Sequence, residues 1–263
     1  VEMGAFGSLV MDAGKKAAVP AGMALAVDRE VFSSYVTQAL SAHPKFSRAH
    51  EEITSMPSEA ELAAHYEYWI IATGPLTSPA MAAVLDGLAQ ASGARGRLYF
   101  YDAIAPVIAA DSIDMGHAFK ASRYGKGTKS HKPDGGEGDY LNLPLTREEY
   151  DAFIAAVAKA EYMPLHAFEE TKYFESCLPI EVMVERGPQT LRFGPMKPVG
   201  LDDSRTGRWP WAVVQLRLEN LEGTMYSMVG FQTKMKWPEQ KRVFSMIPAL
   251  REAEFLRFGS VHR

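Results

Sequence analysis

The only cysteine of the chain, Cys177, is the residue with the clearest chemical potential. It lies just ahead of Pro179, where the sequence predicts the start of a short helix. The positive end of a helix dipole and its free N–H groups favour a thiolate, which adds readily to an electron-poor carbon. Glu175 could act as a base or position a substrate, although a carboxylate near a thiol also opposes its ionisation. The competing interpretation is a small buried hydrophobic residue, the usual role of a lone cysteine.

Cationic side chains gather in the last third of the chain and favour an anionic partner. Residues 186–263 hold 13 Lys and Arg against 7 Asp and Glu, whereas residues 1–185 hold 15 against 25. The segment Leu191–Leu201 contains two Pro and two Gly, which predicts a stiff loop. Such a loop could present Arg192 and Lys197 to a phosphate or a carboxylate.

A second basic cluster surrounds an aromatic residue. Lys234, Lys236, Lys241 and Arg242 lie close to Trp237 in the sequence. Aromatic rings among cations suit RNA, because unpaired bases stack on the rings while phosphates meet the cations. A solvated helix face anchored by one Trp explains the same pattern, and the sequence leaves both interpretations open.

One further motif suggests a cofactor site, and several familiar motifs are absent. The run Ile70-Ile71-Ala72-Thr73-Gly74 predicts a buried strand whose end could approach a ligand closely at glycine, although an ordinary turn has the same composition. No G-x-G-x-x-G, P-loop, G-x-S-x-G or H-E-x-x-H pattern occurs, so neither metal-dependent nor serine-nucleophile chemistry is expected.

The elements that must position these residues follow from hydrophobic periodicity and turn signals. Helices are predicted at 29–42, 78–91, 146–162 and 238–246, the first with Asp28 as N-cap and the third with a capping box at Thr146. Strands are predicted at 23–27, 66–71, 97–101, 106–113, 117–123, 190–193, 212–218, 224–231 and 254–258. The first hundred residues therefore suggest a layered α/β domain, and the rest an α+β domain with an antiparallel or mixed sheet.

Composition limits the class of protein. The chain has 263 residues, 47% hydrophobic and 23% charged, which excludes a disordered, collagen-like or disulfide-stapled protein. No apolar stretch approaches the roughly 18 residues that span a bilayer. A single cysteine indicates a reducing compartment, and we expect a cytoplasmic protein. Neither end carries a start, stop or cap signal, so we expect an internal fragment.

Several runs of sequence carry a resemblance that extends almost from end to end. They are Val19–Gly22, Ala24–Arg29, Ala72–Ser78, Arg123–Tyr124, Tyr140–Asn142, Phe174–Glu181, Phe193–Leu201, Ala212–Arg217, Val229–Thr233, Trp237–Lys241 and Val261–Arg263. In these runs the chain resembles the folate- and FAD-dependent tRNA (uracil-5-)-methyltransferases. The resemblance implies methylation of C5 of a T-loop uracil (uridine 54) in the tRNA T-arm. It also implies 5,10-methylenetetrahydrofolate as carbon donor, reduced FAD as reductant and NAD(P)H to restore the flavin.

The same resemblance implies roles for particular residues. Cys177 would be the nucleophile toward the uracil ring, with Glu175 beside it. The residues implied at the flavin are Ala72, Thr73, Gly74, His262 and Arg263. Those expected to contact RNA are Arg192, Lys197, Lys234, Lys236 and Lys241.

The implied fold is an incomplete FAD-binding domain, Rossmann-like and of the two-dinucleotide-binding type, interrupted by a mixed-sheet insertion domain. Residues 1–97, with 254–263 returning, would form the flavin part, and 98–253 the insertion facing tRNA. The family's glycine-rich loop, second functional cysteine and C-terminal flavin segment have no counterpart here, and Leu143 stands where relatives often carry Cys. We therefore expect this chain alone to bind FAD weakly or not at all. The alternatives are a tRNA-binding module without a cofactor site and a folate-independent tRNA-modifying flavoprotein.

Overall fold

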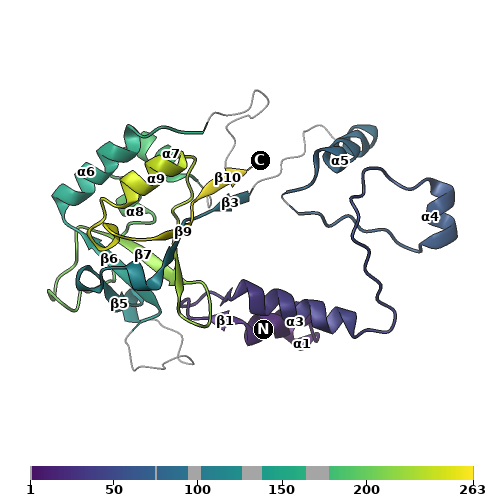
Figure 1. Cartoon of the computed structure of the whole chain (residues 1–263), viewed down its shortest axis with the longest axis horizontal. Helices are drawn as coiled ribbons and strands as arrows, with labels where there is room; N and C mark the ends of the chain where they lie inside the picture. The colour runs from purple at the N-terminus through teal and green to yellow at the C-terminus, as the bar shows by residue number, and fades with distance from the viewer. Residues whose placement is uncertain (1, 75, 94–101, 126–137, 164–177, 263) are drawn as a thin grey trace. The chain divides into compact units, whose positions relative to one another are not determined.

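The computed structural model describes residues 2–74, 76–93, 102–125, 138–163 and 178–262 (Figure 1). The chain divides into two compact units, Val1–Phe46 with Ile104–Ser260, and Ser47–Ala103 with Val261–Arg263. These boundaries differ from those implied by the resemblance, and the assignment of a flavin and an insertion domain stays a prediction.

A six-stranded sheet is the centre of the first unit. Its strands are β4 (Val107–Ala109), β5 (Phe119–Ala121), β6 (Tyr140–Leu145), β7 (Ala212–Leu218), β8 (Met225–Met228) and β9 (Phe255–Arg257). Their order is β5-β6-β7-β8-β4-β9, and every neighbouring pair is antiparallel (Figure 1). The longest pairing joins β6 to β7, from Tyr140 opposite Arg217 to Leu145 opposite Ala212. The expected α+β architecture is therefore confirmed for this part of the chain, and its sheet is antiparallel throughout rather than the mixed sheet that the resemblance implied.

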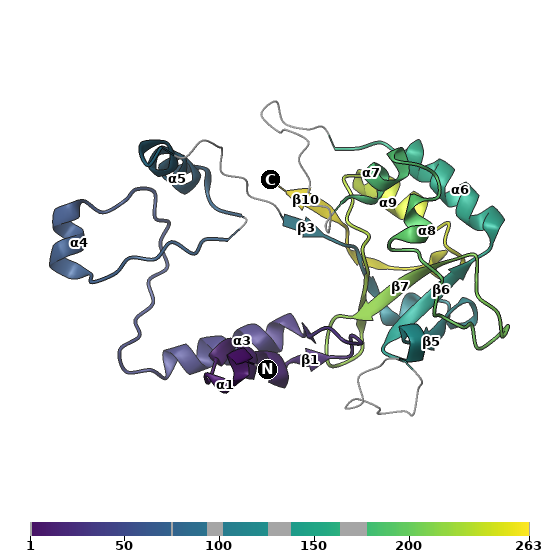
Figure 2. The same ribbon diagram turned by 180° about the vertical axis from the view of Figure 1, so that it is seen from behind.

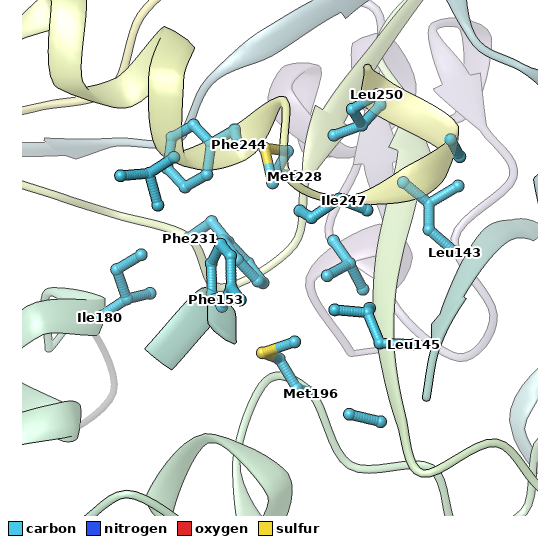
Figure 3. Packing of buried hydrophobic residues seen from close by; sticks show 14 of the residues in the cluster. Leu143, Leu145, Phe153, Ile180, Met196, Met228, Phe231, Phe244, Ile247 and Leu250 are labelled. Atoms are coloured by element: carbon cyan, nitrogen blue, oxygen red, sulfur yellow. The ribbon is translucent and has the colours of Figure 1, made fainter. Parts of the chain in front are cut away.

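Helices cover one face of this sheet (Figures 1 and 2). They are α6 (Arg147–Ala158), α7 (Ile180–Glu185), α8 (Thr190–Phe193) and α9 (Trp237–Phe244). Between helices and sheet, Phe153, Phe231 and Phe244 form an aromatic cluster with ring centroids 6.0–6.5 Å apart (Figure 3). Leu143 and Leu145 point from β6 into the same core, because alternate residues of a strand face the same side (Figure 3).

Local sequence explains where the helices start. Thr146 and Glu149 form the predicted capping box at the start of α6, and the stripe of Tyr150, Phe153, Ile154 and Val157 is buried. Helix α3 (Arg29–Ser41) begins after Asp28, whose carboxylate accepts bonds from the amides of Glu30 and Val31. Both predictions are confirmed.

The remaining elements lie outside the six-stranded sheet and the helices that cover it. The N-terminal segment forms α1 (Glu2–Ala5), α2 (Leu9–Lys16) and the hairpin of β1 (Ala18–Val19) with β2 (Ala26–Val27). The second unit contains α4 (Glu59–His65) and α5 (Pro79–Ala91), the latter as predicted. Strands β3 (Asp102–Ile104) and β10 (Ser260–His262) pair with each other. Short 3-10 turns occur at Ala110–Ser112, Met115–His117, Arg123–Gly125 and Pro248–Leu250.

Two predicted strands are wrong, each for a physical reason. Residues 66–71 form no strand, and Tyr68 and Ile70 are 79% and 83% exposed. A strand needs a neighbour to pair its backbone, and within the described part of the chain none pairs with this segment. Residues 190–193 form the helical turn α8 instead, because the amides of Arg192 and Gly194 bond to carbonyls three residues back. The expected strand at 97–101 lies outside the described residues.

A search of the described residues finds no helix with the length and apolar character needed to cross a bilayer.

Gly200 lies so close to the ring of Tyr124 that a side chain at this position should destabilise the fold. Gly200 has φ +81°, and a Cβ there would lie 2.7 Å from the Tyr124 ring, whereas Gly207, with φ +68°, has open space around it. Both Gly→Ala variants carry left-handed strain of about 1–2 kcal/mol. Only Gly200→Ala also forces the Tyr124 ring, which is 63% exposed, to move, so we expect it to lose more stability than Gly207→Ala. Urea unfolding of both variants measures the difference, and equal losses would contradict the contact.

Candidate functional site

The segment with the predicted nucleophile lies outside the described residues. Glu175 and Cys177 fall in the range 164–177, and Arg263 is also undescribed. His262 lies in β10, and only its backbone is described. The roles of all four residues therefore stay predictions, and the described residues around them carry the structural argument.

The two flanks of the 164–177 range are fixed to one short segment, Gln232–Met235. The amide of Met163 donates to the carbonyl of Lys234 at 2.8 Å, and Tyr162 forms a bridge with Met235. On the other side, the amide of Ile180 donates to the carbonyl of Gln232 at 2.9 Å. The segment Gln232–Met235 thus holds the residues on either side of the range 164–177, which contains the predicted nucleophile.

A buried carboxylate reinforces this anchor. Glu181 in α7 is only 1% exposed, and its two oxygens accept bonds from the Lys234 amide at 2.7 Å and the Thr233 hydroxyl at 2.9 Å. Burial raises the pKa of Glu181, and the two hydrogen bonds oppose that shift without cancelling it. Glu181 was not among the residues expected at the site. Its position between Ile180 and Val182 in an apolar run was the signal that could have indicated a buried acid.

A second network fixes the loop that contains Lys197. The Arg123 guanidinium donates to the carbonyls of Val199 and Lys197 and to the Gln215 side chain, which in turn donates to the buried Asn142 amide oxygen at 2.9 Å. Burial lowers the pKa of Arg123. The stiff loop predicted from its Pro and Gly content is therefore tied to the sheet, an anchor the sequence analysis missed.

The two candidate cations of this loop differ in their surroundings. The guanidinium of Arg192 lies over the ring of Trp211, 3.7 Å from its centroid, and its Nε donates to the Trp211 carbonyl at 2.8 Å. Lys197, in contrast, has an exposed side chain. Arg192 is thus largely used within the fold, and Lys197 is the better placed of the two to meet an anion.

The cluster around Trp237 lies at the start of α9. The Lys236 ammonium pairs with Glu161 at 2.7 Å, while Lys241 is exposed on the next turn of the helix. The backbone of Lys234 belongs to the Gln232–Met235 anchor, one turn before the helix. Lys234 and Lys236 thus lie just before α9 and Lys241 lies in its last turn, and the pairing with Glu161 partly neutralises Lys236.

The predicted flavin residues of the second unit do not lie at a strand end. Ala72, Thr73 and Gly74 are exposed in a turn, where the Thr77 hydroxyl bonds to the Gly74 carbonyl at 2.7 Å and lies 2.6 Å from the Thr73 hydroxyl. Gly74 has φ +74° with open space around it, so close approach of a ligand is sterically allowed. The strand expected before them is absent, and their role at a flavin stays a prediction.

Over the described ranges, no group of three or more His, Cys, Asp or Glu side chains lies close enough to hold a metal ion.

Comparison with known proteins places the chain in a family. The family model described as "Glucose inhibited division protein A" matches residues 1–263, so the chain belongs to this family of proteins. The chain is 56% identical over 257 residues to the methylenetetrahydrofolate–tRNA-(uracil-5-)-methyltransferase TrmFO of Geobacter sulfurreducens, covering 98% of this chain and 55% of that protein. It is 54% identical over 262 residues to the TrmFO of Desulfotalea psychrophila, covering 100% of this chain and 55% of the relative.

These relatives confirm the resemblance inferred from the sequence, and the chain spans about half their length. Among solved structures, Aquifex aeolicus GidA is 14% identical with a TM-score of 0.35, over 61% of this chain and 23% of that chain. That likeness is too low to support an argument about the fold.

The buried Glu181 predicts a pH-dependent stability difference. Its folded pKa lies above the ordinary value of 4.5, so between the two values the folded state binds more protons than the unfolded state. The contribution of Glu181 to stability is therefore full below 4.5 and declines as pH rises through the folded pKa. Glu181→Gln removes this decline, so the variant's stability relative to wild type should increase from about pH 4.5 upward.

Urea unfolding of wild type and Glu181→Gln between pH 4 and pH 8 measures this difference. The exposed Glu148 of α6 gives a control variant, because Glu148→Gln makes the same chemical change at a solvated side chain. A Glu181→Gln difference that does not change with pH would contradict a raised pKa at this site.

Proposed function

We propose that the chain is part of an enzyme that methylates C5 of a uracil in tRNA. The observation that carries the proposal is the 56% identity, over 98% of this chain, to a relative whose name states that reaction and its folate donor. The finer assignment, to uridine 54 of the T-arm, rests on the resemblance of the sequence runs. So do reduced FAD as reductant and NAD(P)H as the source of its electrons, and a cytoplasmic location follows from tRNA as substrate.

Cys177 explains how an unreactive carbon could be methylated. Its thiolate adds to C6 of the uracil ring, so that C5 becomes an enolate-like carbon able to attack the one-carbon unit of 5,10-methylenetetrahydrofolate. Glu175 is the proposed base that removes the C5 proton, while the bond from the transferred carbon to the folate nitrogen breaks and tetrahydrofolate leaves. Once the transferred carbon has been reduced to a methyl group, the thiolate leaves C6 and the ring regains its double bond. When bound, reduced FAD would supply the electrons that bring the transferred carbon to the methyl level.

The flavin domain is the less complete part of the proposal. We assign residues 1–97 and 254–263 to an incomplete Rossmann-like FAD domain and 98–253 to the insertion. Ala72, Thr73 and Gly74 are exposed, and the positive φ of Gly74 leaves room for a ligand to approach the backbone there.

Covalent capture tests the nucleophile. A T-arm RNA with 5-fluorouracil at the target position should become attached to Cys177 in the whole protein, because fluorine at C5 cannot leave as a proton does. Cys177→Ala should abolish the adduct. The adduct is read as a shifted band on a denaturing gel, and peptide mass mapping locates it.

Two controls complete the capture experiment. The same RNA with unmodified uracil should give no lasting adduct, and Glu148→Gln should give as much adduct as wild type. An undiminished adduct in Cys177→Ala would assign the nucleophile to another residue.

Salt dependence tests the proposed RNA contacts of Lys236 and Lys241. Each lysine that neutralises a phosphate contributes about 0.7 to the slope of log affinity against log salt on single-stranded RNA. Lys236→Ala and Lys241→Ala should each reduce the slope for T-arm RNA by about that amount. Lys120, exposed on β5, provides the control variant Lys120→Ala, whose slope should equal that of wild type. Unchanged slopes in both Lys236→Ala and Lys241→Ala would assign these two lysines to a solvated helix face instead.

A further inference from the structure

Trp237 is an exposed aromatic residue held in a fixed position. It is the first residue of α9 and is 64% exposed. Its indole stacks on the ring of Phe258, with centroids 6.1 Å apart and planes 18° apart. A large aromatic side chain that is ordered and yet mostly open to solvent offers a flat apolar surface to a ligand.

The support beneath Trp237 continues into the core. Phe258 stacks on Phe255 at 5.6 Å and 14°, and Phe255 packs against Phe244 at 6.2 Å. Phe244 is fully buried and belongs to the aromatic cluster under α6. The indole is therefore the outer end of a continuous row of rings, so little side-chain entropy remains to be lost when a ligand stacks on it.

The charges beside the indole favour a ligand that is anionic as well as flat. Lys236 precedes Trp237, and Lys241 and Arg242 follow on the next turn of the helix. The pairs Lys236–Glu161 and Arg242–Glu239 are solvent-accessible, with lysine and arginine side chains 45% and 50% exposed. Exposed pairs contribute little to stability, so a phosphate can replace or join the carboxylate at small cost.

We propose that Trp237 is a stacking site for an unpaired nucleobase of RNA, with Lys236 and Lys241 receiving the adjoining phosphates. The inference rests on the proposed function in that it takes RNA as the ligand, and it adds the residue that holds a base. A stacked aromatic ring between cations is the arrangement that single-stranded RNA requires, because every base has a π-face while each linkage carries a charge.

Binding of an eight-nucleotide oligouridylate to the whole protein, measured by fluorescence anisotropy, tests the proposal. Trp237→Ala should weaken binding about tenfold, equivalent to about 1.4 kcal/mol, within the range for loss of one base–aromatic stack. Trp237→Phe keeps a ring on Phe258 and should stay within about threefold of wild type.

Matched controls separate stacking from general effects. Trp209 is 57% exposed and bonds to Asp202, so Trp209→Ala removes a comparable exposed indole away from α9 and should leave affinity unchanged. An oligomer of abasic ribose phosphates keeps the charges but lacks bases, and wild type and Trp237→Ala should bind it equally. Thermal unfolding of each variant confirms that the fold is retained.

The outcomes distinguish the stacking site at Trp237 from RNA binding by the protein as a whole. If wild type binds oligouridylate and Trp237→Ala binds it equally well, the stacking site is overturned while RNA binding stands. If Trp237→Ala weakens the abasic oligomer as much as oligouridylate, the residue acts through the fold or the charges, and the stacking site is again overturned. If the wild-type protein does not bind RNA, both the stacking site and the proposed RNA substrate fail.

Discussion

The packing of three phenylalanines between the helices and the sheet is the constraint on which the rest of the first unit depends. Phe153 comes from α6, Phe244 from α9 and Phe231 from the segment after β8, so a single cluster fixes two helices and a loop against the strands. Fully burying one such side chain contributes about 1.5–3 kcal/mol, and the rings also constrain each other's orientation. Both candidate functional regions are attached to this cluster by short lengths of chain.

One branch leads from Phe231 to the predicted nucleophile. The next residues are Gln232–Met235, which bond to Met163 and Ile180 on either side of the segment that carries Cys177. Glu181 fixes the position of this segment, because a buried carboxylate requires hydrogen-bond donors. Here the donors are the Thr233 hydroxyl and the Lys234 amide. The hydrogen bonds of Ile180 and Glu181 to Gln232–Lys234 fix the backbone shortly after Cys177, which would help to position a reactive thiol.

The other branch leads from Phe244 to the surface. The row of rings through Phe255 and Phe258 ends at Trp237, the first residue of α9, with Lys236 just before it and Lys241 one turn later in the helix. Core packing and ligand recognition thus use the same kind of contact, aromatic stacking, at opposite ends of one row. Because the Trp237 ring is already held by Phe258, little side-chain entropy would be lost when a ligand stacks on it.

The helices with explicit start signals and the α+β class of the first unit follow from the sequence alone. The capping box at Thr146, the N-cap at Asp28 and the periodic apolar residues act within one or two turns of chain, so local physics decides them. Membership of the family could also be inferred from the sequence, because it rests on contiguous runs such as Phe174–Glu181 and does not depend on the fold.

Only the tertiary structure decided which residues share a site and which segments stay extended without pairing. The burial of Glu181, the network of Arg123 with Gln215 and Asn142, and the stack of Phe258 on Trp237 all join residues distant in the chain. The strand predicted at 66–71 failed for the same reason. Its sequence is apolar enough, but a strand exists only when a neighbouring segment accepts and donates its hydrogen bonds, and that depends on the whole fold.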